Sequence, residues 1–143
     1  MYAHILLPTD GSELATKGVR DGLALASALG AAATILTVTD PWPLGLGVAD
    51  QTMLDDWATD AAEAAKLILE EAAKMAATAG VSCTTAYVPD KHPAEAIIEY
   101  VEAHAIDLIV IASHGRRGFR RMLLGSQAAE VLSRSGVPVL IIK

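Results

Sequence analysis

One stretch of the chain combines a buried strand with a loop suited to binding an anion: Leu108-Ile109-Val110-Ile111-Ala112-Ser113-His114-Gly115-Arg116-Arg117-Gly118-Phe119-Arg120-Arg121-Met122-Leu123-Leu124-Gly125-Ser126. Its first four residues are apolar and predict a strand in the core. A helical pattern follows Ser126. Backbone N–H groups can converge on an anion where a glycine-bearing loop leads from a strand into a helix. The stretch therefore predicts a strand, an anion-binding loop that contains Gly115 and Gly125, and a helix.

Strand and helix patterns alternate along the rest of the chain. Short apolar runs predict five strands, at residues 4–7, 33–38, 82–88, 108–111 and 139–142. Helical periodicity predicts helices at residues 12–29 and 52–79, from residue 93 onward, and at 126–135. This alternation predicts an α/β fold with one open, mostly parallel five-stranded sheet and helices on both faces. The 143 residues fit a single domain that spans residues 1–143.

Particular residue types mark where the helices begin, end and face the core. Ser12 and Ser126 are the expected N-caps, and Gly30 and Gly80 are expected to end the first two helices. Two prolines and two glycines predict an irregular flap at residues 41–47. The expected buried face of the long helix comprises Leu54, Trp57, Ala61, Ala65, Ile68, Ala72, Met75 and Ala79. For the helix that begins at Pro93, it comprises Ile97, Ile98, Val101 and Ala105.

The composition limits the classes of function. Hydrophobic residues make up 52% of the chain and the mean hydropathy is +0.38, as is typical of a well-filled core. The net charge of −6 argues against general nucleic-acid binding. No apolar run approaches about 18 residues and the first residues lack the basic region of a signal peptide, so we expect a cytoplasmic protein that does not enter membranes. The single cysteine, Cys83, is expected in the core and cannot form an internal disulfide.

Loops that carry polar residues or glycines follow three of the predicted strands, at residues 8–12, 38–40 and 112–126. The carboxyl ends of parallel strands lie at one edge of a sheet, and open α/β sheets bind ligands there, near the point where the strand order reverses. We therefore expect the three loops to line one site.

The whole chain resembles the universal stress protein family. The motifs that carry the resemblance are Ile5-Leu6-Leu7-Pro8-Thr9-Asp10-Gly11-Ser12, Ile109-Val110-Ile111-Ala112-Ser113-His114-Gly115-Arg116, Gly125-Ser126 and Val137-Pro138-Val139-Leu140-Ile141-Ile142. The resemblance implies a Rossmann-like fold of the adenine-nucleotide-binding type. It also implies a homodimer that forms through the last strand, between Val137 and Ile142. The resemblance leaves open whether the protein also binds a different protein partner.

ATP-binding members of that family carry the pattern G-x2-G-x9-G-[S/T]. In this chain the pattern is Ala112-x2-Gly115-x9-Gly125-Ser126, with alanine in place of the first glycine. The resemblance implies that the ligand is ATP or another adenine nucleotide, together with Mg²⁺, and that the backbone at Ala112 lies close to it. The residues implied to lie beside the adenine and ribose are Pro8, Thr9, Asp10 and Val38. The residues implied to hold the phosphates are Gly115, Arg116, Gly125, Ser126 and Gln127.

Some of these residues also fit a purely structural role. Asp10 fits both the pocket and the cap of the first helix. Family members usually carry a small or aliphatic residue where Gln127 stands, so the resemblance gives its long amide side chain no role. His114 lies in the loop without an evident carboxylate partner, so we expect a structural role rather than catalysis.

Two further groups of side chains have competing interpretations. Arg116 is expected near the phosphates, because it follows Gly115 directly. A solvent-facing role, with a partner-binding surface as the alternative, is expected for Arg117, Arg120 and Arg121. Trp42 and Trp57 are expected to pack in the flap and the helix rather than to stack on a ligand.

The leading hypothesis is a nucleotide-binding regulatory module in the stress response. A slow ATPase or adenylyl-transfer enzyme is one alternative, although the loops offer no general base and the Gly-Lys-[Ser/Thr] of a Walker A motif is absent. A nucleotide-free dimeric scaffold is another, against which the presence of Gly115, Gly125 and Ser126 argues. A phosphoacceptor receiver domain needs paired acids after its first strand, where this chain has Asp10 alone. A flavodoxin needs a hydroxyl-rich loop there, for which Thr9 and Ser12 are thin evidence.

Overall fold

A computed structural model describes residues 1–116 and 124–143. Its elements, in chain order, are β1 (His4–Pro8), α1 (Glu13–Leu29), β2 (Ala32–Val38), the 3-10 turn η1 (Leu44–Leu46), α2 (Gln51–Ala79), β3 (Cys83–Val88), α3 (Pro93–Ala103), β4 (Leu108–Ala112), α4 (Ser126–Arg134) and β5 (Val139–Ile142). The predicted alternation of strands and helices is confirmed. The flap expected at residues 41–47 is irregular apart from η1.

The five strands form one sheet in the order β3-β2-β1-β4-β5, and every pairing in it is parallel. β1 is the central strand: Leu6 is in register with Thr34 of β2 on one side and with Ile109 of β4 on the other. The chain first builds outward from β1 through β2 to β3, and then returns to the opposite side of β1 with β4 and β5. The strand order therefore reverses between β1 and β4, and the loops that follow these two strands meet at the same edge.

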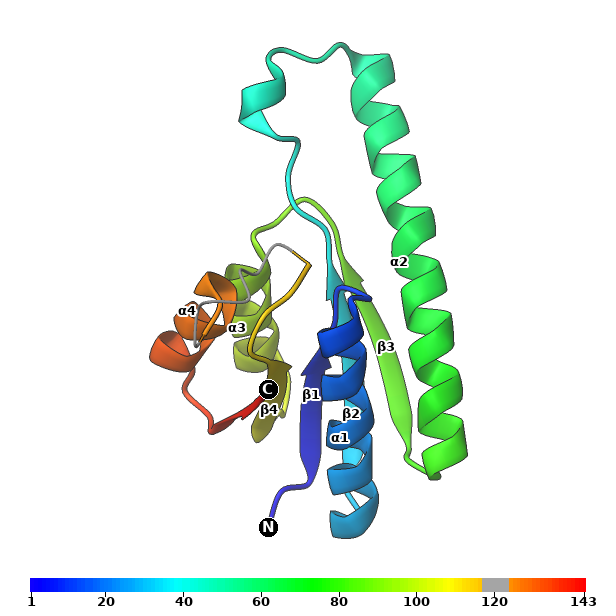
Figure 1. Cartoon of the computed structure of the whole chain (residues 1–143), viewed down its shortest axis with the longest axis vertical. Coiled ribbons are helices and arrows are strands. Elements are labelled where there is room, and N and C mark those ends of the chain that lie inside the picture. Colours follow the sequence, from blue (N-terminus) through cyan, green and yellow to red (C-terminus); the bar gives the residue numbers. More distant parts are fainter. Residues whose placement is uncertain (117–123) are drawn as a thin grey trace.

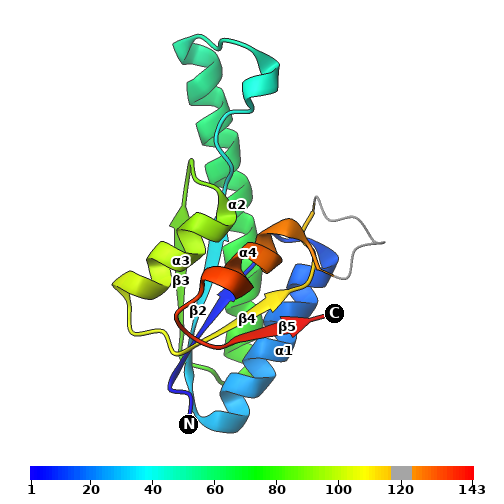
Figure 2. The same ribbon diagram turned by 90° about the vertical axis from the view of Figure 1, so that its left-hand side faces the viewer.

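Helices cover both faces of the sheet, as the sequence predicts (Figures 1 and 2). α1 and α2 pack on one face, where Val19 and Ala72 meet Leu7, Ile35 and Val110 of the strands. α3 and α4 pack on the opposite face with another set of strand residues, which includes Leu6, Leu36, Ile97, Ile109 and Val131. Neighbouring residues of a strand point to opposite faces, so Leu6 and Leu7 supply one core each.

The predicted ends of the first two helices are confirmed. The Ser12 hydroxyl accepts a hydrogen bond from the N–H of Ala15, at 3.3 Å, and so caps α1. Gly30 and Gly80 end α1 and α2 in the left-handed conformation, with φ of 66° and 69°. Glycine suits these positions because it has no Cβ to clash there.

The predicted cap of α4 and one residue of the predicted buried face of α3 are wrong. Gly125 is the residue that precedes α4, and Ser126 is its first helical residue rather than its cap. The Gly125 N–H is held by the Ser113 carbonyl oxygen at 2.6 Å, which fixes the bend one residue early. α3 ends at Ala103, so Ala105 is exposed, and Ile106 takes the buried position instead. The Ile106 N–H bonds the His104 carbonyl, which turns the chain toward β4.

The apolar stripe predicted for α2 is correct only in part. Ala65 and Ala72 are buried as expected, whereas the other buried residues of α2 are Leu69 and Ala76, and Leu54 is exposed. Figure 1 shows the reason: the first half of α2 extends beyond the sheet and has no strand to cover. Periodicity identifies a helical face, but it does not show how far along the helix that face has a partner.

Cys83 lies on β3, an edge strand, so it packs against the core but is partly exposed. The predicted core position is therefore confirmed only in part. Burial raises the pKa of its thiol above the ordinary value. Within residues 1–116 and 124–143, we find no helix with both the length and the apolar character needed to cross a lipid bilayer.

Candidate functional site

The turn after β1 is fixed by backbone hydrogen bonds to β2. Pro8 is the last residue of β1, and the N–H of Thr9 continues the pairing by bonding the Leu36 carbonyl at 2.9 Å. The carbonyl of Thr9 accepts from the buried Thr37 hydroxyl at 3.0 Å. The next residue but one, Gly11, has φ of 79°, which a residue with a Cβ rarely adopts. These contacts, on either side of Asp10, hold its side chain at the carboxyl edge of the central strand.

Asp10 joins the loop after β1 to the loop after β4. One carboxylate oxygen accepts from the Ser12 N–H at 2.9 Å, and the other accepts from the Arg116 N–H at 2.5 Å. The guanidinium of Arg116 donates in return to the Asp10 carbonyl oxygen at 2.9 Å. The two residues are separated by 106 positions in the sequence, so this contact defines the site. Ser12 rather than Asp10 caps α1, and the Asp10 carboxylate instead bonds the N–H of that capping residue.

Gly115 is needed for this contact because of its size. A Cβ placed on Gly115 would lie 2.6 Å from Oδ2 of Asp10, which is too close for any real side chain. Its φ is not in the left-handed region. The glycine therefore serves the close approach of the two loops, and it keeps the backbone beside Asp10 accessible.

Gly125 closes the other end of the loop in a similar way. Its N–H donates to the carbonyl of Ser113 at 2.6 Å, and a Cβ on Gly125 would lie 2.9 Å from that same oxygen. Ser113 itself is buried, and its N–H bonds the Ile142 carbonyl of β5 at 2.8 Å. The first turn of α4 is thus anchored directly to the end of β4.

Ala112, which stands where the pattern has its first glycine, is the last residue of β4 and is buried. A Cβ added to Gly18 of α1 would lie 3.7 Å from the Ala112 methyl group. The methyl group therefore faces α1, in the core between sheet and helix. The φ of Ala112 is not positive, so alanine fits this position without strain.

The loop after β2 lies at the same edge of the sheet. Val38 is the last residue of β2 and is partly buried. Thr39 is held from three directions: its N–H bonds the Val88 carbonyl, its carbonyl accepts from the Lys91 N–H, and its hydroxyl lies 2.6 Å from the Tyr87 hydroxyl. These contacts fix the backbone that directly follows Val38 at this edge of the sheet.

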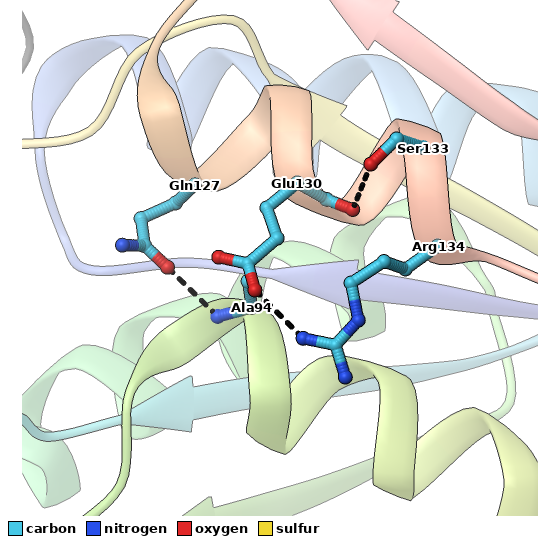
Figure 3. Close-up of polar contacts among 5 residues, drawn as sticks. All are labelled: Ala94, Gln127, Glu130, Ser133 and Arg134. Carbon is cyan, nitrogen blue, oxygen red and sulfur yellow. Dashed lines mark hydrogen bonds and ion pairs between the residues drawn. The ribbon is translucent and has the colours of Figure 1, made fainter.

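The first two residues of α4 have exposed side chains with different surroundings. The first hydrogen bond of the helix runs from the Ala129 N–H to the Gly125 carbonyl, so the N–H groups of Ser126 and Gln127 have no acceptor within the helix. The side chain of Gln127, however, reaches across to α3, where its oxygen accepts from the Ala94 N–H at 2.9 Å (Figure 3). The backbone of Gln127 remains a candidate phosphate contact, while its side chain caps the start of α3.

Three further predictions about charged and metal-binding side chains concern this edge of the sheet. His114 packs beside Gly125, its Nδ1 is 3.0 Å from the Ser113 hydroxyl, and its Nε2 is buried without a partner. In the described part of the chain, no three acidic, histidine or cysteine side chains are placed to hold a metal ion. The three other arginines of the predicted cluster, Arg117, Arg120 and Arg121, lie outside the described residues.

Two shallow hollows lie near the edge but do not contain the glycines of the loop. One, of about 260 Å³, lies between α1 and α2 and borders Thr9 and Gly11. The other, of about 300 Å³, lies between α2 and β3, where Lys66, Glu70 and Tyr87 line it. The hydrogen-bonded meeting of the two loops, rather than either hollow, brings polar groups from several strand ends together.

The structure brings Asp10, Gly115 and Arg116 together as the sequence predicts, but three residues that hold these loops were not predicted. Ser113, Thr37 and Tyr87 supply the contacts that hold Gly125, Thr9 and Thr39 in place. Ser113 could have been noticed, since it stands inside the glycine pattern directly after a strand. Thr37 and Tyr87 could not, because they are ordinary strand residues whose partners come from other strands.

Comparison with known proteins connects this geometry to a family. The model of the universal stress protein family matches residues 1–143. Universal stress protein MJ0531 of Methanocaldococcus jannaschii is 30% identical over 143 residues, which cover all of this chain and 83% of that protein.

Solved structures agree in fold. The structure of protein MJ0577 from the same organism has a TM-score of 0.87 at 28% identity and covers 100% of this chain and 96% of its own. A universal stress protein solved in complex with cAMP has a TM-score of 0.76 at 26% identity, with 99% and 97% covered. Two more distant structures of this fold were solved with dAMP and with AMP. The chain therefore belongs to the universal stress protein family.

Proposed function

We propose that this protein is a regulatory module that binds ATP with Mg²⁺ at the carboxyl edge of its sheet and acts as a homodimer in the stress response. The observation that carries the proposal is the contact of Asp10 with Gly115 and Arg116, which joins the loops after β1 and β4 where the strand order reverses. Such switch points are where open α/β sheets bind nucleotides. Adenine nucleotides are also the ligands held by the related structures described above.

The nucleoside end of the ligand fits beside β1 and β2. Each oxygen of the Asp10 carboxylate accepts one hydrogen bond from a backbone N–H. A carboxylate has about four acceptor positions, so Asp10 keeps capacity for the hydroxyl groups of a ribose. Val38 ends β2 at the same edge, where its backbone can meet the adenine.

The phosphate end fits the loop that leads into α4. The N–H groups of Ser126 and Gln127 lack acceptors within the helix, and a helix N-terminus carries roughly half a positive charge. The exposed guanidinium of Arg116 adds a full positive charge on the other side of the loop. When bound, Mg²⁺ would neutralise charge on the phosphates, with the nucleotide as the source of its ligands. Charge-assisted hydrogen bonds of about 1.5–3 kcal/mol each, less the cost of association, support micromolar affinity.

The homodimer is proposed through β5. This strand is at the edge of the sheet, its residues are only partly buried, and Leu140 is exposed. An unpaired edge with apolar side chains is suited to pairing with a second copy. The single cysteine, which excludes an intrachain disulfide, is compatible with the reducing cytoplasm in which we propose that the protein acts.

A pair of glycine variants tests the site. Gly125→Val places a branched side chain against the Ser113 carbonyl, whereas Gly136→Val enters open space outside the site. Equilibrium dialysis with labelled Mg-ATP should show micromolar binding to the native protein and to Gly136→Val. Binding by Gly125→Val should be at least about tenfold weaker.

Thermal unfolding of each variant shows whether weak ATP binding comes from a changed site in a folded protein or from a protein that does not fold. If Gly125→Val does not fold, Asp10→Ala replaces it, since that change removes a side chain and introduces no clash. Native affinity in a folded Gly125→Val or Asp10→Ala protein would contradict the proposed site. A native protein that binds no ATP at millimolar concentrations would contradict the proposed function.

A further inference from the structure

A projecting segment, residues 41–60, has no role in the nucleotide site and stands away from the sheet. We call it the arm; it comprises the chain between β2 and α2, with η1, and the first turns of α2 (Figures 1 and 2). The first buried residue of α2 is Ala65, so residues 51–64 cover no part of the core. At 1.5 Å per residue, about 20 Å of helix projects in this way.

The arm exposes five large apolar side chains within a short stretch of the sequence. Leu44 is 95% exposed and Leu46 is 63% exposed, and Val48 is fully exposed. Met53 and Leu54 add exposed apolar surface in the first turn of α2. Single exposed apolar residues are common on protein surfaces, but five within eleven consecutive positions are a concentration typical of interaction sites, and we call these five residues the patch.

Specific contacts hold the arm in shape without help from the core. The rings of Trp42 and Trp57 pack edge to face, with centroids 5.3 Å apart. The Trp42 indole N–H donates to the Gly47 carbonyl at 3.2 Å, which folds the loop back on itself. Asp50 caps α2 by accepting from the Met53 N–H at 2.8 Å. The patch is therefore presented on an ordered support.

The acidic charge of the chain is concentrated at the arm. Residues 41–60 contain four of the 17 acidic residues and none of the 11 basic ones, so the arm carries four of the six net negative charges of the chain. Asp56 and Asp60 are exposed and lie four residues apart, on one face of α2, with Met53 on the same side. The patch is thus apolar with acidic side chains interspersed.

We propose that the arm is a docking surface for a segment of a partner protein that is both basic and apolar, such as an amphipathic helix with Lys or Arg on one face and Leu on the other. Burial of Leu44, Leu46 and Met53 would supply affinity, and the aspartates would select the basic partner. A second copy of the arm does not fit, because two surfaces of the same strong negative charge repel each other. Nucleic acids and anionic lipids are excluded from the arm for the same reason.

The position of the arm connects this surface to the sheet edge. The arm follows Thr39, which is bonded to Tyr87, Val88 and Lys91 at the carboxyl ends of β2 and β3. The base of the arm is therefore fixed at this edge of the sheet. The docking proposal stands on the arm alone and does not depend on nucleotide binding.

The two tryptophans of the chain are both in the arm, so intrinsic tryptophan fluorescence reports on this surface and on no other. The probe is a synthetic helical peptide of Leu and Lys that contains no tryptophan. Titration of the full chain with this peptide should shift the tryptophan emission maximum until the signal saturates. The affinity should fall by about tenfold between low and high salt, because screening weakens charge attraction. A Leu/Glu peptide of the same pattern should cause no shift.

Two variant pairs locate the binding. Leu44→Ser with Leu46→Ser removes apolar surface from the arm, and Leu132→Ser removes an exposed leucine from α4 as a matched control. Asp56→Asn with Asp60→Asn removes charge from the arm, and Asp21→Asn with Glu102→Gln removes two exposed charges elsewhere. Each arm variant should weaken peptide binding by about tenfold or more, and each control should bind as the native protein does.

The arm variants change no core residue, so circular dichroism should show native folding for all of them. Unchanged emission on addition of the Leu/Lys peptide would overturn the proposal. Equal affinity in the arm variants and their controls would also overturn it. So would a concentration-dependent emission change of the protein alone that Leu44→Ser with Leu46→Ser abolishes, because that result would make a second copy the occupant.

Discussion

The glycines of the loop after β4 act through the space that they leave. Gly115 allows Asp10 to approach the backbone, and Gly125 allows the Ser113 carbonyl to approach the start of α4. Neither has a positive φ, in contrast to Gly11, which does. Because the loop tolerates no Cβ at these two positions, substitutions there act first on the shape of the loop. Only by way of that shape would they change affinity for a ligand.

Ala112 yields a prediction that separates packing from ligand contact. Its methyl group is buried against α1, so Ala112→Gly should lower the free energy of unfolding by about 1–2 kcal/mol, from the lost methyl burial and the freer glycine backbone. Affinity for ATP should stay within about twofold of native, which is under about 0.5 kcal/mol. Urea unfolding measures the first quantity and equilibrium dialysis the second.

The control for this change is Ala86→Gly, at a partly buried alanine of the edge strand β3, which should cost less stability. An Ala112→Gly protein that binds ATP about tenfold more tightly, at unchanged stability, would contradict our placement of the methyl group.

At the scale of elements, α3 and α4 are linked at their first turns. The residue that precedes α3, His92, makes no side-chain capping bond, and the Gln127 side chain supplies the acceptor from α4 instead. The Ala94 residue that donates is fully buried. Gln127 therefore fixes the position of α4, and of the N–H groups at its start, relative to α3.

The capping bond predicts a loss of stability when Gln127 is replaced. Gln127→Ala should lower the free energy of unfolding by about 1 kcal/mol, because the Ala94 N–H loses its acceptor. Gln127→Glu should retain the bond and most of the stability, since a carboxylate also suits a helix N-terminus. Urea denaturation of the three proteins measures the difference.

Ser133→Ala provides the matched control on the same helix. Its exposed hydroxyl donates to the Glu130 carbonyl within the same helix (Figure 3), so its removal should change stability by less than about 0.5 kcal/mol. If Gln127→Ala were as stable as Ser133→Ala, the bond between Gln127 and Ala94 would contribute nothing to the free energy of unfolding.

The helices show which features of the fold can be predicted from local sequence and which cannot. The caps at Ser12, Gly30 and Gly80 are local signals, and they placed helix ends correctly. The roles of Leu69 and Gln127 depend on partners elsewhere in the chain. Leu69 is buried because the sheet lies under that part of α2, and Gln127 bends toward an N–H 33 residues away. Because both partners lie far away in the sequence, local patterns predict neither the burial of Leu69 nor the contact of Gln127.

At the scale of the whole molecule, topology assembles the candidate site. Because all strands are parallel and the order reverses between β1 and β4, loops from residues 8–12 and 112–116 meet beside the end of β2. The sequence predicted this convergence, since strand–helix alternation is enough to place strand ends on one edge. The projection of the arm was not predictable, because a uniform helical pattern over residues 52–79 gives no sign of where the sheet stops.

The most direct test of the nucleotide site is an NMR titration of the uniformly ¹⁵N-labelled protein with Mg-ATP, followed through backbone amide signals. We predict that the amides of Gly11, Gly115 and Gly125 shift together, with one saturable micromolar Kd. The amide signals of Lys66 and Ala73, which line the groove between α2 and β3, should not shift. Shifts confined to that groove, or no shifts up to millimolar ATP, would contradict a nucleotide site formed by the loops after β1 and β4.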